Sequence, residues 1–220
     1  MICYDEFQKI TRKANKNSLA KRKPVFGVGE NDSDYITKIV VRGKTIACPA
    51  YIKWKSMLLR AYSADCHSRQ VTYFGVSVCE DWLTFSTFRN WLCKHDGFES
   101  LDLDKDILQA GNKIYSPEYC LLVTRSVNTL LLDGQKSRGK LMVGVSMNRG
   151  LFMSQCNNGN RQVTLGRFNT EEEAHEVYKY HKYHHIVNVA NEQSCKKTKE
   201  GLLARAAIFK TEYKPDNKKW

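Results

Sequence analysis

Long apolar runs are missing from this sequence. No uninterrupted apolar stretch approaches the roughly 18 residues that a membrane-spanning helix requires. The first residues, MICYDE, are followed by polar sequence and not by the charged and then apolar regions of a secretory leader. These absences predict a cytoplasmic protein that has no membrane partner.

Closely spaced cysteine pairs are also missing, although the chain has 8 cysteines. In a reducing compartment these thiols are expected to be free and to fill small gaps in the core. Cys66 beside His67, and Cys93 two residues before His95, are suggestive zinc-ligand pairs. However, no two cysteines have the spacing of a zinc knuckle, so the sequence argues against structural zinc.

Acidic residues are few compared with basic ones. The chain has 35 Lys and Arg but 23 Asp and Glu, which gives a formal net charge of +12. Residues 1–27 hold seven basic and two acidic residues, and residues 196–220 hold eight and three, so each end contributes +5. Two interpretations stay open. The ends are either solvated segments without a specific partner, or segments that bind a polyanion, since Lys and Arg release counterions from phosphates.

Apolar periodicity predicts a helical, aromatic scaffold in the first half of the chain, after a loose basic arm. A helix is expected to begin near Pro49, which suits a first helical turn. A second helix after Glu80 carries a ridge of aromatic residues, which are Trp82, Phe85, Phe88 and Trp91. Such a ridge could be a binding platform, but core packing is its more common role.

Three aspartates in the segment LDLDKDIL form a candidate metal site. Alternation along a strand places Asp102, Asp104 and Asp106 on one face, with Asn112 and Asn128 following in sequence. Carboxylate and amide oxygens suit Mg²⁺. A solvated acidic edge, or aspartates that cap the next helix, is the alternative explanation.

The segment after the polar linker 134–142 predicts a small sheet covered by a helix. Strands are expected at 144–148, 151–156 and 161–165, separated by Arg149-Gly150 and by a turn that contains Asn-Gly. A helix follows, capped by Asn169 or Thr170, with glutamates 171–173 at its positive end.

Alternation along these strands predicts two different sheet faces. The face toward the helix is small or apolar and consists of Val145, Ser154, Cys156, Val163 and Leu165. The outer face is polar and consists of Ser146, Asn148, Gln155, Asn157, Gln162 and Thr164, bordered by Arg149, Arg161 and Arg167. Because amides pair with adenine edges and arginine with guanine, this face predicts contact with double-stranded DNA. An ordinary solvated face is the alternative, although Lys, Glu and Thr are more usual there.

The same segment, GVSMNRGLFMSQCNNGNRQVTLGRFNTEEEAHEVY, resembles the Apetala-Two, or ethylene-response-factor, DNA-binding domain. The matching residues, in order, are Gly144, Val145, Leu165, Gly166, Phe168, Thr170, Glu173, Ala174 and Tyr178. The resemblance implies that the outer strand faces enter the major groove. The plant proteins carry more Arg and Trp on that face, so their base preference does not transfer.

A second resemblance covers about residues 26–190. The strings CPAYIKWKSMLLRAY, VCEDWLTFSTFRNWL and LDLDKDILQAGNKIYSPEYCLLVTRSVN, together with the C-terminal module, are similar to phage HNH, or His-Me-finger, homing endonucleases. In that family a strand carries an Asp metal ligand followed by a His general base, and a helix brings an Asn or His ligand.

The likeness to the nuclease pattern implies Asp104 and Asp106 on the strand, a helix that starts near 116–118, and Asn128 as the helix-borne ligand of Mg²⁺. Lys105 stands at the general-base position, where the family has His. Lysine is a poor base at neutral pH unless its pKa is strongly lowered, and neighbouring carboxylates act in the opposite direction.

The fold class expected is α+β: a helical scaffold with a ββα-metal-like nuclease centre, then a three-stranded antiparallel sheet plus helix. The expected parts are a basic arm (1–25), an HNH-like domain (26–133), a linker (134–142), an Apetala-Two-like domain (143–192) and a basic tail (193–220).

Two alternative hypotheses about function follow from the sequence. One is a free-standing phage homing endonuclease, acting inside the bacterial host, in which Asp104, Lys105 and Asn128 support Mg²⁺-dependent hydrolysis of DNA. The other is a non-catalytic DNA-binding regulator or site competitor with a degenerate nuclease centre. The sequence predicts no oligomeric state.

Overall fold

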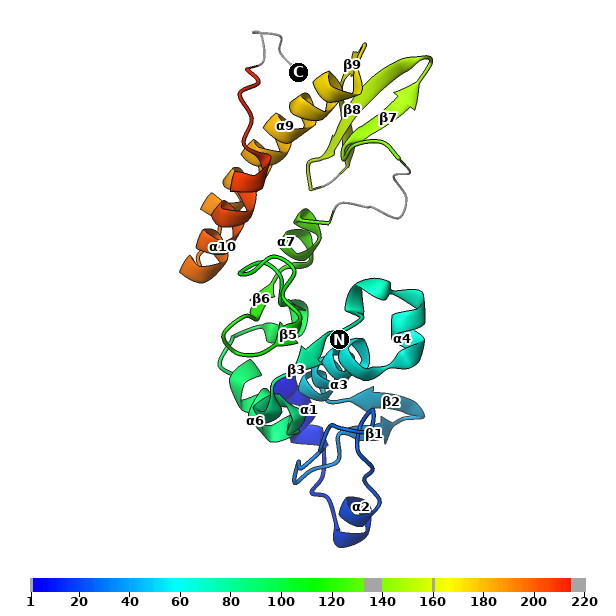
Figure 1. Ribbon diagram of the computed structural model, residues 1–220. Helices are drawn as coiled ribbons and strands as arrows, with labels where there is room; N and C mark the ends of the chain where they lie inside the picture. Colours follow the sequence, from blue (N-terminus) through cyan, green and yellow to red (C-terminus); the bar gives the residue numbers. More distant parts are fainter. Residues whose placement is uncertain (1, 133–139, 160, 215–220) are drawn as a thin grey trace. The chain divides into compact units, whose positions relative to one another are not determined.

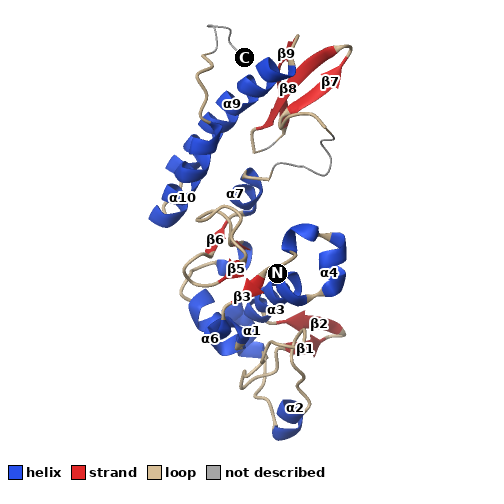
Figure 2. Ribbon diagram, in the orientation of Figure 1, coloured by secondary structure: helices blue, strands red, loops and turns tan. Residues whose placement is uncertain are grey.

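The computed structural model describes residues 2–132, 140–159 and 161–214 (Figure 1). Contacts divide the chain into two compact units, unit 1 (Met1–Thr124) and unit 2 (Arg125–Trp220). Both units contain helices and strands, which confirms an α+β protein (Figure 2). The division comes before the predicted linker 134–142, and residues 134–139 of that linker lie outside the described residues.

The N-terminal segment is folded, so the expectation of a loose arm at residues 1–25 is wrong. Helix α1 (Tyr4–Ile10) begins after Cys3, whose backbone N–H donates to the Glu6 carboxylate at 3.1 Å. Helix α2 (Lys16–Ala20) begins after Asn15, whose Oδ1 accepts from the Ser18 backbone N–H at 2.8 Å. Phe7 of α1 is fully buried in the core of unit 1, and this burial holds the segment in place.

A hairpin and a long helix follow in unit 1. Strands β1 (Lys38–Val41) and β2 (Lys44–Ala47) are antiparallel, and helix α3 (Pro49–Tyr62) begins at the expected proline. Trp54 of α3 is fully buried, and its indole N–H donates to the Trp82 carbonyl at 2.7 Å. Burying both the rings and the indole donor stabilises this part of the core.

The aromatic ridge belongs to the core, as predicted, but it spans two helices. Helix α5 (Glu80–Leu83) and helix α6 (Phe85–Leu92) are separated by Thr84, whose backbone is extended. The break has a tertiary cause, because the backbone of Glu30 bonds on both sides of Thr84. The Glu30 backbone N–H donates to the Leu83 carbonyl at 2.8 Å, and the Glu30 backbone carbonyl accepts from the Phe85 N–H at 2.9 Å.

The remaining elements of unit 1 are short. They are α4 (Ala64–Arg69), the 3-10 helices Val71–Tyr73 and Phe98–Ser100, and strands β3 (Ser77–Val78), β4 (Asp102–Asp104), β5 (Ile114–Tyr115) and β6 (Leu121–Val123). Strand β3 is parallel to β5, and β4 is antiparallel to β6. Residues 116–118 were expected to start a helix but form part of a turn instead. The Cys120 backbone N–H closes this turn by donating a hydrogen bond to the Ser116 carbonyl at 2.9 Å.

Unit 2 contains the predicted sheet and its covering helix. After α7 (Arg125–Leu130), the strands β7 (Val145–Asn148), β8 (Leu151–Asn157) and β9 (Gln162–Phe168) form an antiparallel sheet in chain order. Helix α9 (Glu171–Asn191) follows, and the Thr170 hydroxyl accepts from the Glu173 N–H at 3.2 Å. Thr170 is therefore the cap, one of the two candidates that the sequence offered.

Residues 196–209 are also helical, which corrects the expectation of a tail for that part of residues 193–220. Helix α10 (Lys196–Ala206) packs against α9 and buries Leu202 and Ala206 completely, and a 3-10 turn (Ala207–Phe209) follows. Residues 215–220 lie outside the described residues. In the part of the chain that the structure describes, no helix is both long and apolar enough to cross a bilayer.

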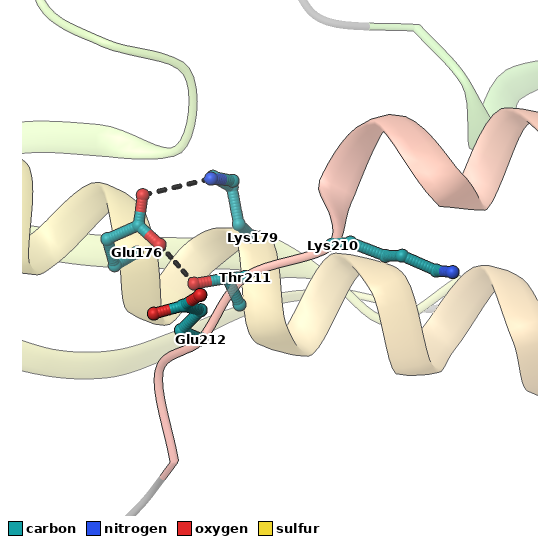
Figure 3. Close-up of a pocket in the computed structure, with 5 residues that line it drawn as sticks. All are labelled: Glu176, Lys179, Lys210, Thr211 and Glu212. Atoms are coloured by element: carbon teal, nitrogen blue, oxygen red, sulfur yellow. Dashed lines mark hydrogen bonds and ion pairs between the residues drawn. The ribbon is translucent and has the colours of Figure 1, made fainter.

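Residues 210–212 extend along α9 and line an open pocket beside it (Figure 3). The Glu176 carboxylate accepts from the Thr211 hydroxyl and from the Lys179 ammonium, the latter at 2.9 Å. These hydrogen bonds, that of Thr211 above all, lower the pKa of Glu176. The end of the described chain is thereby attached to the same helix that supports the sheet.

Candidate nucleic-acid interface

The inner face of the β7–β8–β9 sheet packs on α9 as expected. Ser154 is fully buried, and Val145, Cys156 and Leu165 are buried with it. Cys156 and Leu165 form a cluster with Val177 and Tyr178 of α9, and Val163 packs against that cluster. The strands and the helix therefore present one fixed surface to the outside.

All six polar residues predicted for the outer face lie opposite the buried set. Asn157, Gln162 and Thr164 are exposed, while Ser146, Asn148 and Gln155 are partly exposed. The register pairs Gln155 with Thr164, and Asn157 with Gln162, so these side chains are neighbours across two strands. The structure thus brings the predicted reading residues together.

Hydrogen bonds connect the centre of this face. Gln155 Oε1 accepts from Ser146 Oγ at 3.3 Å and from Gln162 Nε2 at 3.1 Å. These contacts order three side chains from three strands before any partner arrives, which lowers the entropy cost of binding. The amide nitrogen of Gln155 is at the other edge of its carboxamide, where it can donate to an acceptor atom.

Asn157 has a second role, because it supports the turn between β8 and β9. Its Oδ1 accepts from the Gly159 N–H at 2.8 Å, and the Asn158 Oδ1 accepts from the Arg161 N–H at 3.1 Å. We therefore expect Asn157 to position this loop more than to read a base. Arg161, at the end of the turn, is exposed.

Two further arginines border the outer face. Arg149 is exposed at the tip of the β7–β8 hairpin, and Arg167 is exposed on β9. Simple alternation would place Arg167 on the buried side with Leu165. A register shift between Ser154 and Gln155 instead pairs Arg167 with Met153, on the outer side. Met153 also belongs to this face, which the sequence did not indicate because an apolar residue gives no signal for a polar surface.

Comparison with known proteins gives no guide to this surface. No protein-family model, curated protein or solved structure matches the chain. The two family resemblances therefore stay predictions from the quoted residues, and the interface is argued from its side chains alone.

The candidate nuclease centre has a different geometry from the expected one. Asp104 Oδ1 accepts from the backbone N–H groups of Asp106 at 2.8 Å and Ile107 at 2.7 Å. It caps the turn that ends β4. The alternative that the sequence left open was a cap on a following helix, but residues 105–111 form bends and a turn instead. Burial raises the pKa of Asp104, and the two backbone hydrogen bonds oppose that change.

Lys105 is buried and bound on several sides. Its ammonium donates to both carboxylate oxygens of Asp106 at 2.8 Å and to the Asn112 carbonyl at 2.6 Å. Asn112 in turn donates its side-chain amide to the Lys105 carbonyl at 2.9 Å. Because these contacts hold the ammonium in place within the fold, they favour a structural role over that of a general base.

The residues proposed to hold Mg²⁺ do not fit that ion. Both oxygens of Asp106 bind an ammonium, which occupies the position and the charge that a cation would need. Asn128, the third expected ligand, lies on α7. No cluster of three or more His, Cys, Asp or Glu suited to a metal occurs within residues 2–132, 140–159 and 161–214. His95, which the sequence pairs with Cys93 as a suggestive zinc ligand, bonds through Nδ1 to the Trp91 carbonyl at 3.1 Å.

Three of the four histidines of α9 lie within residues 181–185, and they differ in exposure. His184 is exposed, but His181 and His185 are partly buried, and burial lowers the pKa of both. Near and below the unfolded pKa of about 6.5, the histidines of the unfolded chain take up protons more readily than those of the folded chain, so stability is lost as pH falls.

We expect unit 2 of the wild type to lose more stability between neutral and mildly acidic pH than a His181→Gln/His185→Gln variant does. Chemical denaturation monitored at several pH values would measure this, and parallel pH profiles would contradict it.

Proposed function

We propose that this protein binds double-stranded DNA by placing the outer face of the β7–β8–β9 sheet in the major groove. The observation that supports the proposal is the composition of that face. Amide and hydroxyl side chains occupy its centre, and the exposed Arg149, Arg161 and Arg167 lie around it. A small antiparallel sheet has the dimensions to enter the major groove, where each base pair presents its own pattern of donors and acceptors.

Each group has a distinct task in this proposal. Gln155 and Gln162 offer amide donors to acceptor atoms such as guanine O6 and N7 or thymine O4. The arginines bind phosphates or guanine edges, which adds affinity and makes binding sensitive to salt. Because α9 fixes the sheet from behind, these groups move as one surface.

Replacing Gln155 or Gln162 with alanine is expected to change sequence preference and leave non-specific affinity almost unchanged. Each loss of an amide contact should cost about 1–3 kcal/mol at one base pair. The preferred site would first be selected from a randomised duplex library. Affinities for its single-base variants would then be measured by fluorescence anisotropy.

Gln109→Ala is a matched control, because Gln109 is also exposed but lies in unit 1. It should leave base preference unchanged. Equal losses on the selected duplex and on random duplexes, with either sheet variant, would count against direct reading of bases.

We further propose that DNA is bound without being cut at Asp104. The contacts of Asp104, Lys105 and Asp106 support this, since they satisfy the groups that hydrolysis would need. Purified protein with Mg²⁺ is expected to leave supercoiled plasmid intact. Nicking by the wild type that disappears in Asp104→Ala would overturn this and support the homing-endonuclease hypothesis.

A further inference from the structure

Two hairpins of the chain, one in each unit, share an unusual tip. In the β1–β2 hairpin, Val41 pairs with Lys44, and the two-residue loop is Arg42-Gly43, with φ of +49° and +74°. In the β7–β8 hairpin, Asn148 pairs with Leu151 and the loop is Arg149-Gly150, with φ of +52° and +82°. Both loops therefore place an arginine in the left-handed region of backbone space.

Arginine is a poor choice for the first position of such a loop. Two-residue loops with positive φ at both positions strongly prefer Asn, Asp or Gly, because other side chains are strained there. Turn stability alone does not explain an arginine at both tips. Backbone strain of this kind is typical of functional positions.

The β1–β2 hairpin lies in a basic part of unit 1. Lys38, Arg42 and Lys44 are exposed on the hairpin, and residues 35–64 contain no Asp or Glu. None of these three forms an ion pair with any residue that the structure describes. Their charges are therefore not neutralised by neighbouring carboxylates.

The N-terminal segment adds two cations beside the base of the hairpin. The Arg12 carbonyl accepts from the Ile36 N–H at 2.9 Å, and Lys13 forms a β-bridge with Tyr35. Arg12 and Lys13 are themselves exposed, and residues 7–29 contain no Asp or Glu. Folding thus brings together two acid-free segments that are separate in the sequence.

We propose that the β1–β2 hairpin is a second DNA-contacting element, in which Arg42 and Lys44 bind phosphates of the duplex. This inference rests on the proposed function, because it takes DNA as the partner, but it concerns unit 1 and not the sheet of unit 2. A two-stranded β-ribbon can enter the major groove, and exposed cations at its tip are complementary to phosphate. The protein then holds DNA through both of its units.

The test uses the full chain and a duplex of random sequence, about three helical turns long. Arg42→Asn/Lys44→Gln removes two charges, and Asn tolerates the positive φ that Arg42 adopts. Lys55→Gln/Lys94→Gln is the matched control, because it removes two charges from exposed residues elsewhere in unit 1. Affinity is measured by anisotropy at several salt concentrations.

The hairpin variant is expected to lower the slope of log affinity against log salt by about 1.8, since each lost phosphate contact contributes about 0.9. Between roughly 50 and 200 mM salt, wild-type affinity should therefore fall about 12-fold more than that of the variant. The control variant should keep the wild-type slope.

The two proposals fail in different ways. Identical slopes for wild type and hairpin variant would overturn the hairpin proposal. They would leave the sheet proposal standing if Gln155→Ala still changed base preference. A hairpin that instead bound an acidic protein would give the same identical slopes on DNA. The absence of any salt-sensitive binding by the wild type would overturn both proposals.

Discussion

Replacing Gly144 with alanine is expected to destabilise unit 2 far more than the same change at Gly150. Both glycines have positive φ, +79° and +82°, so both substitutions introduce backbone strain of about 1–2 kcal/mol. The two substitutions differ in the space that is open to the added Cβ atom. A Cβ at position 144 would overlap the Cγ and Cδ2 atoms of Tyr178, whereas a Cβ at position 150 would meet nothing within 4 Å. Overpacking of this kind typically costs a further 1–3 kcal/mol or so.

Gly144→Ala should also weaken the proposed DNA binding, because Tyr178 belongs to the cluster that joins α9 to the sheet. Urea denaturation of both variants would measure the difference in the free energy of unfolding. Anisotropy would then show whether affinity falls together with stability. Equal stabilities for the two variants would mean that the sheet and α9 pack less closely than described.

Lys105→Met is expected to lower the stability of unit 1 and to leave the interaction with DNA unchanged. Methionine keeps the apolar stem but removes the ammonium, so the buried Asn112 carbonyl loses its donor and Asp106 loses its partner. An unsatisfied buried acceptor costs about 1–3 kcal/mol. Denaturation would show this loss, whereas Lys94→Met, at an exposed lysine, should be nearly neutral.

The same variant separates the two interpretations of Lys105. If it were a general base, plasmid cleavage would be lost in Lys105→Met while stability stayed close to wild type. The contacts predict the reverse pattern, with lower stability and no cleavage in either protein.

Several elements could be predicted because their signals are local. Pro49 begins α3 and Thr170 caps α9, and both choices depend on residues within one helical turn. The two faces of the sheet follow from a two-residue period, so Ser154 and Gln155 were assigned to opposite sides correctly. The outer-face residues of the candidate interface were found for the same reason.

The nuclease centre could not be judged from the sequence. Asp104, Lys105 and Asp106 have the right residue types for a metal site, but their function depends on what each atom bonds to. The Lys105 ammonium reaches the Asn112 carbonyl only after residues 105–112 have folded back, and local alternation contains no information about that contact.

The amino-acid sequence by itself determined the α+β class, the order of β7, β8, β9 and α9, and the polarity of the outer sheet face, because these depend on short-range periodicity. Tertiary structure alone decided the rest. It buried Phe7 of α1 and Leu202 of α10 in cores, so that helices fold in both charged ends, and it introduced the β8–β9 register shift by which Arg167 comes to the outer side. The reason is that burial and strand register depend on contacts with residues far away in the chain, and a local sequence pattern does not identify those residues.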